Sequence, residues 1–240
     1  AWDRRMPEQR NRILIDHMSD VLLPYNQYHR ENLIRENIHP SKIFCTGNTT
    51  FEAMREFAPQ INNSDILTRL RLESKGYILV TAHRSENVDN IEYLHKIIEA
   101  TGRIAKRFKR EVIYPMHPRT KSKLTSFEIP KGVRIMDPLG FYDFNHLLKE
   151  SFCVVSDSGT AAEEGLFYKV PNVSLRMATE RPETVESGAT IISGMDLNNI
   201  VESVETAVSL PWSAKYDFAE DHSPSSVVIN SIRSQITNFF

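Results

Sequence analysis

Short apolar runs alternate with helical patterns along the chain from residue 76 onward. The runs lie at residues 77–82, 112–114, 133–136, 152–156, 173–175 and 189–193. Continuous apolar strands that are separated by helices indicate a parallel sheet with helices on both faces. After the first run, Ile91, Leu94, Ile97, Ile98 and Ile104 recur at helical spacing and predict a helix over residues 90–108. The pattern therefore predicts the α/β class, with a doubly wound parallel sheet.

The first 65 residues show the same alternation but contain only two strand-like runs, at residues 21–23 and 42–45. The helical patterns around them lie near residues 7–17, 27–36 and 50–57. Two parallel strands do not form an independent sheet. We therefore expect the chain to begin inside a domain, with residues 1–65 as its C-terminal part.

A second, complete domain is expected over residues 66–222, after a polar stretch at residues 59–65 that starts the linker. The final helical pattern, over residues 223–240, has apolar residues on one face at Val228, Ile232, Ile236 and Phe239. We expect this last helix to pack back on the first domain.

Composition excludes several classes of protein. The 240 residues contain 29 Lys and Arg against 31 Asp and Glu, and 40% are hydrophobic, which is typical of a globular protein. No apolar run is long enough to span a bilayer, and the first residues have no signal-peptide character. The near-neutral charge argues against a nucleic-acid partner, and the basic cluster over residues 103–110 is interpreted as the exposed face of a helix. We expect a cytoplasmic protein with neither a membrane nor a nucleic acid as partner.

The sequence also lacks the motifs of common cofactor enzymes. It has no GxGxxG after a strand, no Walker A lysine, no HExxH and no GxSxG. Cys45 and Cys153 both lie in strand-like runs and form no ligand-spaced pair, so we expect buried thiols of a reduced compartment. We expect no metal and no redox cofactor.

Two stretches have the pattern of an anion site. Residues 156–165 follow an apolar strand, make a tight turn at Ser158, Gly159 and Thr160, and then open a helix. The free N–H groups and the positive dipole end of a helix N-terminus favour a phosphate. A second helix start follows at residues 179–183, where Arg181 can bind phosphate oxygens and Pro182 suits the first helical position. Two phosphate sites indicate a diphosphate.

Polar residues after other strands add further candidates. His83 and Arg84 follow the first strand at its carboxyl end, where open α/β sheets bind ligands. His117 repeats this arrangement one strand later, with a structural role in its loop as the alternative. Glu163 completes a capping box with Thr160, so Glu164 is the better candidate for binding ribose hydroxyls.

Together these motifs resemble the non-hydrolysing UDP-N-acetylglucosamine 2-epimerase family. The matching motifs, in chain order, are MPEQRN at 6–11, CTGN at 45–48, HR at 83–84, YPMH at 114–117, DSGT at 157–160 with Glu163 and Glu164, and TERPE at 179–183. The resemblance runs essentially from end to end. It implies a GT-B-like pair of Rossmann-like domains with a UDP-sugar in the cleft, no cofactor, and a homodimer when the protein is full length.

The resemblance also implies a reaction and roles for single residues. Family members invert C2 of the sugar by eliminating UDP to a 2-acetamidoglucal intermediate and adding it back. Carried over by motif, Ser158, Gly159 and Arg181 hold the diphosphate, Glu164 the ribose, and Phe144 lies against the uracil. Glu8 and His83 match positions that act in the proton and leaving-group chemistry. Arg84 and His117 match positions that contact a second, regulatory UDP-sugar in some bacterial members.

The departure from the family is at the amino terminus, where motifs that supply an early arginine, an aspartate and a glutamate are missing. We therefore expect a fragment with the donor half of the site. Residues 140–145 and the Ser-Gly-Thr turn look closest to the branch that includes UDP-N-acetyl-L-fucosamine synthases. A GT-B glycosyltransferase and a module that only binds UDP-sugar are the alternatives. The family points to precursor synthesis for surface polysaccharides such as capsules.

Overall fold

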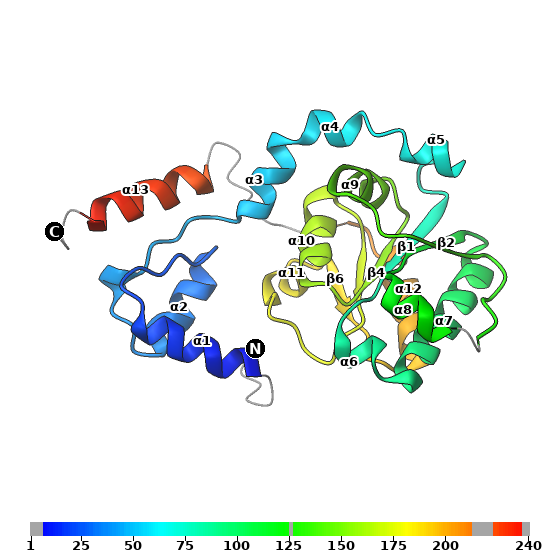
Figure 1. Cartoon of the computed structure of the whole chain (residues 1–240), viewed down its shortest axis with the longest axis horizontal. Helices are drawn as coiled ribbons and strands as arrows, with labels where there is room; N and C mark the ends of the chain where they lie inside the picture. The colour runs from blue at the N-terminus through cyan, green and yellow to red at the C-terminus, as the bar shows by residue number, and fades with distance from the viewer. Residues whose placement is uncertain (1–6, 125–126, 213–222, 237–240) are drawn as a thin grey trace. The chain divides into compact units, whose positions relative to one another are not determined.

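A computed structural model of the chain describes residues 7–124, 127–212 and 223–236 (Figure 1). The chain divides into two compact units. One unit is residues 1–56 together with 217–240, and the other is residues 57–216.

Residues 57–216 are built around a parallel sheet of six strands among the described residues. The strands are β1 (Tyr77–Thr81), β2 (Glu111–Pro115), β3 (Val133–Met136), β4 (Val154–Ser156), β5 (Asn172–Ser174) and β6 (Thr190–Ile192). Their order is β3-β2-β1-β4-β5-β6, and every neighbouring pair is parallel. The predicted doubly wound sheet is confirmed, and the strand order reverses between β1 and β4.

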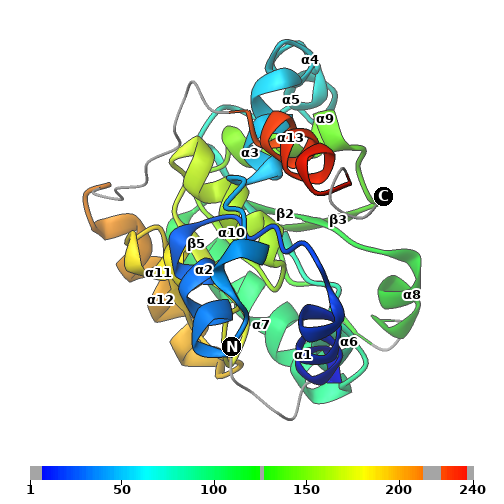
Figure 2. The same cartoon turned by 90° about the vertical axis from the view of Figure 1, so that its left-hand side faces the viewer.

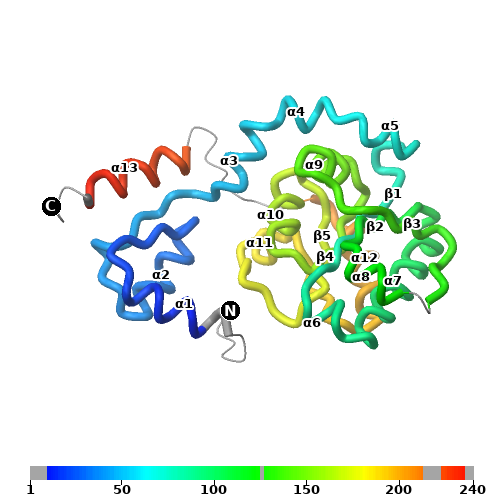
Figure 3. The backbone as a smooth tube through the Cα atoms, viewed as in Figure 1, coloured from blue at the N-terminus to red at the C-terminus, as the bar shows by residue number. Residues whose placement is uncertain are grey.

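Helices connect the strands and cover the sheet. In chain order they are α4 (Ala58–Asn62), α5 (Ile66–Leu70), α6 (Ser85–Val88), α7 (Ile91–Phe108), α8 (Pro118–Lys121), η2 (Ser122–Leu124), α9 (Phe141–Lys149), α10 (Gly159–Tyr168), α11 (Pro182–Glu186) and α12 (Leu197–Ser209). Helices α4 and α5 both contact α9 (Figure 3). Nδ1 of His146 in α9 lies 2.6 Å from the carbonyl oxygen of Ile61 in α4.

The two faces of the sheet bury alternate residues of the same strand. In β1, Ile78 and Val80 lie in the apolar cluster that includes α7 and α12, whereas Tyr77 and Leu79 lie in the cluster that includes α9 and α10. All four side chains are fully buried. Figures 1 and 2 show these two helix pairs on opposite sides of the sheet. Because both faces are covered, β1 and β4 are apolar along most of their length, as the continuous runs predicted.

Helix α7 agrees with the helical spacing in all but its first residue. Asn90 caps it, accepting hydrogen bonds from the N–H groups of Glu92 and Tyr93. Leu94, Ile97, Ile98 and Ile104 are buried against the sheet. Ile91 was expected on the same apolar face but is 51% exposed. It occupies the first helical position, where no preceding turn covers it.

The smaller unit contains α1 (Pro7–Met18), α2 (Gln27–Arg35), η1 (Pro40–Lys42), α3 (Thr49–Glu56) and α13 (Pro224–Ile236). Residues 21–23 and 42–45 were expected to form strands, and this expectation is wrong. In the described part of the chain they are joined by one parallel bridge, between Leu22 and Ile43. Such short runs need neighbouring strands to extend the ladder. Cys153 is buried as expected, but Cys45 is only half-buried and belongs to no strand.

Helix α13 contacts α3 in this unit. Glu52 of α3 accepts hydrogen bonds from the Ser223 hydroxyl at 2.7 Å and from the Ser225 N–H at 2.9 Å, at the start of α13. Of the apolar face expected on this helix, Ile232 is 43% exposed. Phe239 and the side chain of Ile236 lie outside the described residues.

Candidate functional site

A cavity of about 320 Å³ opens at the carboxyl ends of β1, β2 and β4. This is the edge where the strand order reverses, and parallel sheets bind ligands at such a point. Its lining residues are Thr81, Ala82, His83, Pro115, His117, Pro138, Leu139, Phe144, Ser158, Thr160, Ala161 and Glu164. Six of them are residues that the sequence singled out: His83, His117, Phe144, Ser158, Thr160 and Glu164.

The turn from β4 into α10 forms one wall of this cavity. Ser158 is the N-cap of α10, and its hydroxyl accepts a hydrogen bond from the N–H of Ala161 at 3.4 Å. The helix therefore begins at Gly159, two residues after the buried Asp157. The capping box expected between Thr160 and Glu163 is wrong, because the cap comes two residues earlier.

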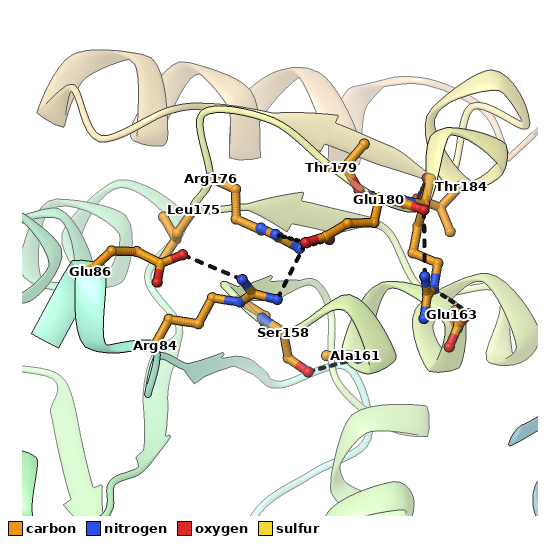
Figure 4. Close-up of polar contacts among 12 residues, drawn as sticks. Arg84, Glu86, Ser158, Ala161, Glu163, Leu175, Arg176, Thr179, Glu180 and Thr184 are labelled. Carbon is orange, nitrogen blue, oxygen red and sulfur yellow. Dashed lines mark hydrogen bonds and ion pairs between the residues drawn. The ribbon is translucent and has the colours of Figure 1, made fainter. Parts of the chain in front are cut away.

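Three arginines from two separate segments lie around the start of α10: Arg84 follows β1, whereas Arg176 and Arg181 both lie between β5 and α11. Figure 4 draws Arg84 and Arg176 with their contacts to Glu180. A Cβ atom added at Gly159 would lie 3.8 Å from Cγ of Arg181 and 3.9 Å from Nη1 of Arg176. Arg84, at the end of β1, lies with its Nη2 atom 3.8 Å from Oε1 of Glu180, which is also paired with Arg176. These guanidinium groups and the positive end of the α10 dipole together favour a multiply charged anion.

Three carboxylates pair with these arginines in the described part of the chain. Glu86 accepts a hydrogen bond of 3.3 Å from Nη1 of Arg84. Oε1 of Glu163 accepts a hydrogen bond of 2.7 Å from Nε of Arg181, and the Glu163 side chain is buried. Glu180 accepts from both terminal nitrogens of Arg176, at 2.5 and 2.6 Å. Burial alone would raise the pKa of Glu180, but the hydrogen bond and charge of Arg176, with help from Arg84, lower it to about 2.

Asp157 fixes the turn after β1 to the turn after β4. Its fully buried carboxylate accepts hydrogen bonds from the backbone N–H groups of His83 and Arg84 and from the side-chain amide of Asn87. The His83 ring is 57% exposed, and its Nδ1 atom lies 3.7 Å from Oδ1 of Asp157. The backbone of His83 is thus held firmly, while its ring faces the cavity that it lines.

His117 is held by its own helix start. It is the N-cap of α8, and its Nδ1 atom accepts a hydrogen bond from the N–H of Arg119 at 3.2 Å. The ring also lines the cavity. The structural and functional interpretations of His117 are therefore compatible.

Glu164, from α10, and Phe144, from α9, also line the cavity. Burial raises the pKa of Glu164 to about 8; the Asn145 amide, at 3.5 Å, opposes this rise and the charge of Glu163 adds to it. Phe144 is half-buried and packs against the apolar cluster that contains Leu147. A neutral carboxyl beside an aromatic ring suits a ligand that offers hydroxyl groups and a flat ring.

Glu8 lies outside the compact unit that contains this cavity. It belongs to α1, in the other compact unit, and its side chain lies outside the described residues. Within residues 7–124, 127–212 and 223–236, no three His, Cys, Asp or Glu side chains are grouped to hold a metal ion. In the same part of the chain, no helix is long and apolar enough to cross a membrane.

Sequence reasoning missed four polar residues of the site. Asp157 was noted only as part of a motif, while Asn87, Arg176 and Glu180 were given no role. Arg176 directly follows an apolar run, so the rule that selected His83 at the end of a strand could have found it. Asn87 has no such signal, because it lies 70 residues from Asp157 in sequence.

Comparison with known proteins places this fold and site in a family. The family profile described as UDP-N-acetylglucosamine 2-epimerase matches residues 1–226. The UDP-N-acetylglucosamine 2-epimerase of Methanocaldococcus jannaschii is 35% identical over an alignment of 237 residues, which covers 95% of this chain and 65% of the relative. The UDP-2,3-diacetamido-2,3-dideoxy-D-glucuronate 2-epimerase of Pseudomonas aeruginosa is 33% identical over 210 residues, 87% of this chain and 58% of that protein.

A solved structure agrees with these sequence relatives. The crystal structure of the Methanocaldococcus jannaschii UDP-GlcNAc 2-epimerase in complex with UDP-GlcNAc and UDP superimposes with a TM-score of 0.84 at 34% identity. The likeness covers all of this chain and 66% of that one. The chain thus spans slightly less than two-thirds of the length of these relatives. Taken with the doubly wound sheet and the arginine-lined helix start at its switch point, these comparisons show that the chain belongs to the UDP-N-acetylglucosamine 2-epimerase family.

Proposed function

We propose that this chain forms the UDP-binding part of a 2-epimerase that interconverts UDP-N-acetylglucosamine and UDP-N-acetylmannosamine, or acts on a close UDP-2-acetamido sugar. The observation that carries the proposal is the convergence of Arg84, Arg176 and Arg181 on the start of α10, beside a cavity at the switch point. The bound UDP-GlcNAc and UDP of a relative at 34% identity support this choice of ligand.

In this proposal the diphosphate binds at the start of α10. Ser158 and Gly159 supply N–H and hydroxyl donors, with Thr160 beside them, and Arg181 supplies a guanidinium group. Glu164 binds the ribose hydroxyls, and Phe144 lies against the uracil. The lining of the cavity supports this division, since Ser158 and Thr160 lie at the start of α10, whereas Phe144 belongs to α9 and packs against the apolar cluster of Leu147.

The chemistry begins with the departure of UDP. A base removes the C2 proton, the C2–H electron pair forms the C1=C2 bond of the glucal, and the C1–O bond breaks with its electrons passing to UDP. Donors at the diphosphate stabilise the charge that develops on the leaving group. Re-addition of UDP and of a proton on the other face of C2 completes the epimerisation. We assign the acid and base roles to His83 and Glu8, and the exposed ring of His83 on the cavity wall supports its part.

Further properties are proposed on the family resemblance. Arg84 and His117 contact a second, regulatory UDP-sugar, and the full-length protein is a cytoplasmic homodimer that supplies surface-polysaccharide synthesis. Residues 1–65 belong to an N-terminal domain, and residues 66–222 form the UDP-binding domain. Synthesis of UDP-N-acetyl-L-fucosamine is the alternative within the family, and the related diacetamido-glucuronate epimerase supports some breadth of substrate.

Binding is tested first with UDP alone, by calorimetry on this chain. We expect Arg181→Ala to weaken UDP binding by about 1.5–3 kcal/mol, the contribution of a charged hydrogen bond. The matched control is Arg107→Ala, because Arg107 also pairs with a glutamate but lies on the exposed face of α7. Equal UDP affinity in the Arg181 variant and the wild type would remove Arg181 from the site.

Chemistry is tested by incubating a protein that joins this chain to a complete N-terminal domain with UDP-N-acetylglucosamine in deuterated water. Deuterium at C2 supports the epimerase. Sugar transfer that needs an added acceptor supports a glycosyltransferase instead. UDP-sugar binding without either reaction supports a module that only binds UDP-sugar.

A further inference from the structure

Glu180 lies between two arginines, Arg176 and Arg84, that are close to the start of α10 and therefore to the proposed diphosphate site. Both of its carboxylate oxygens are hydrogen-bonded to Arg176, and Oε1 lies 3.8 Å from Nη2 of Arg84 (Figure 4). The Arg176 nitrogen that pairs with Oε2 is Nη1, which would lie 3.9 Å from a Cβ atom added at Gly159, at the start of α10. The carboxylate therefore occupies a guanidinium edge that an anion at this helix start would meet.

Arg176 needs a negative partner at all times. Its side chain is only 6% exposed, and a buried guanidinium without a counter-ion is strongly destabilising. Glu180, in contrast, is 33% exposed and lies in the segment between β5 and α11, outside any helix or strand. It can move into solvent at low cost if another anion takes its place. Its low pKa, about 2, keeps it charged throughout the neutral range.

Glu163 shows the opposite arrangement on the neighbouring arginine. Its side chain is 3% exposed and lies within α10, so it remains beside Arg181. The site thus combines one buried, fixed carboxylate with one that is partly exposed and lies on a loop.

We propose that Glu180 is an exchangeable counter-ion, which holds Arg176 and Arg84 while the site is empty and leaves them when a diphosphate binds. The inference rests on the proposed function and adds a rule for selectivity. An incoming ligand must replace a carboxylate that contacts two guanidinium groups, which favours a diphosphate over a single monoanion. Empty and occupied sites then both keep the buried Arg176 neutralised.

The test compares wild-type chain, Glu180→Gln and Glu180→Asp by calorimetry with two probes, UDP and inorganic pyrophosphate. Removing the competing charge should tighten binding of both probes by about tenfold in Glu180→Gln, the scale of one charged hydrogen bond. Glu180→Asp keeps the charge but is one methylene shorter, so it should tighten binding by a smaller factor. Melting temperatures with and without saturating UDP are measured in parallel. We expect Glu180→Gln to lower the melting temperature of the empty protein more than that of the UDP-bound protein.

Glu111→Gln is the matched control. Glu111 also forms a two-bond pair with an arginine, Arg134, and is 34% exposed, but it lies at the amino end of β2. Its substitution should lower both melting temperatures equally and leave the affinity for both probes unchanged.

The outcomes separate this inference from the proposed function. Wild-type or weaker affinity for both probes in the two folded Glu180 variants overturns the inference while UDP binding stands. If the wild-type chain binds pyrophosphate but not UDP, the proposed function fails, and the order of pyrophosphate affinities still decides the role of Glu180. If neither UDP nor pyrophosphate binds any of the three proteins, the inference on Glu180 and the proposed function are both overturned.

Discussion

The backbone N–H of His83 donates to both carboxylate oxygens of Asp157, at 3.1 Å each. Asp157 follows β4 and His83 follows β1, so this contact joins the two turns on either side of the point where the strand order reverses. A fully buried carboxylate is costly unless it is well hydrogen-bonded, and here the N–H of Arg84 and the amide of Asn87 complete its partners. The position of His83 in the site is therefore set by a group that takes no part in the proposed chemistry.

Asp157→Asn should destabilise the protein. The amide nitrogen replaces one carboxylate oxygen and turns new N–H donors toward the backbone N–H of His83, so at least one buried donor is left without an acceptor, at a cost of about 1–3 kcal/mol. Urea unfolding measures the change. Asp137→Asn is the control, because the Asp137 side chain is 83% exposed, and it should leave stability unchanged. Equal stability of the two variants would contradict the role given to Asp157.

Gly159→Ala should separate ligand binding from folding. The nearest atoms to an added Cβ lie at 3.8 and 3.9 Å, which is ordinary contact distance, so the empty protein should keep its melting temperature. The same methyl group lies where a diphosphate would approach the backbone, and we expect UDP affinity to fall about tenfold or more. Gly140→Ala, with no atom within 4 Å of the added Cβ, is the control at the start of α9. Wild-type UDP affinity in the Gly159 variant would move the diphosphate away from α10.

Phe144→Ala should affect both stability and binding. The ring lines the cavity and also packs on the apolar cluster, but it is only half-buried. We expect a loss of stability smaller than the roughly 3–5 kcal/mol of a fully buried phenylalanine, together with weaker UDP binding. Leu147→Ala on the same helix removes a fully buried side chain and should cost stability with little effect on UDP affinity. If the Phe144 variant loses stability but keeps wild-type UDP affinity, Phe144 is an ordinary core residue.

Glu164 should make stability depend on pH. Burial raises its pKa from 4.5 to about 8, so between these values the unfolded chain loses the proton while the folded protein keeps it. The contribution of Glu164 to the free energy of unfolding is therefore most favourable below pH 4.5 and is lost as the pH rises toward 8. Between these values the free energy of unfolding should fall by up to about 1.4 kcal/mol per pH unit. Glu164→Gln should remove this part of the slope in urea unfolding between pH 5 and 8. Glu99→Gln, at an exposed position, should leave the slope unchanged.

His83→Ala and Glu8→Gln should reduce turnover in a protein that contains this chain and a complete N-terminal domain. Acid and base groups typically contribute about 10²- to 10⁴-fold to a rate, and neither residue is assigned to UDP binding. Because the ring of His83 is exposed, its removal should change the stability of the protein little. The measurements are deuterium incorporation at C2 and UDP affinity, and a large loss of UDP affinity with unchanged turnover would reverse the assignment.

The periodicity of single segments was enough to predict the doubly wound domain. The apolar runs became the six strands, and the spacing of Leu94, Ile97 and Ile98 became the buried face of α7. The turn at Ser158 and Gly159 could also be found from sequence, because tight turns and helix starts depend on residues that are close neighbours in the chain. The two short runs near Leu22 and Ile43 failed as strands, since a strand needs partners that its own sequence does not specify.

The pairing of charges was decided only by the tertiary structure. Asp157 meets His83 across 74 residues, and Arg181 meets Glu163 across 18, so neither pair has a local spacing that predicts it. Even Arg176 and Glu180, four residues apart, form their pair in a loop, where no helical periodicity brings them together. The order of the strands determines which turns become neighbours, and burial then determines which charges must be paired. Local sequence specifies the elements of this protein, whereas the electrostatics of its site follow from how those elements are placed side by side.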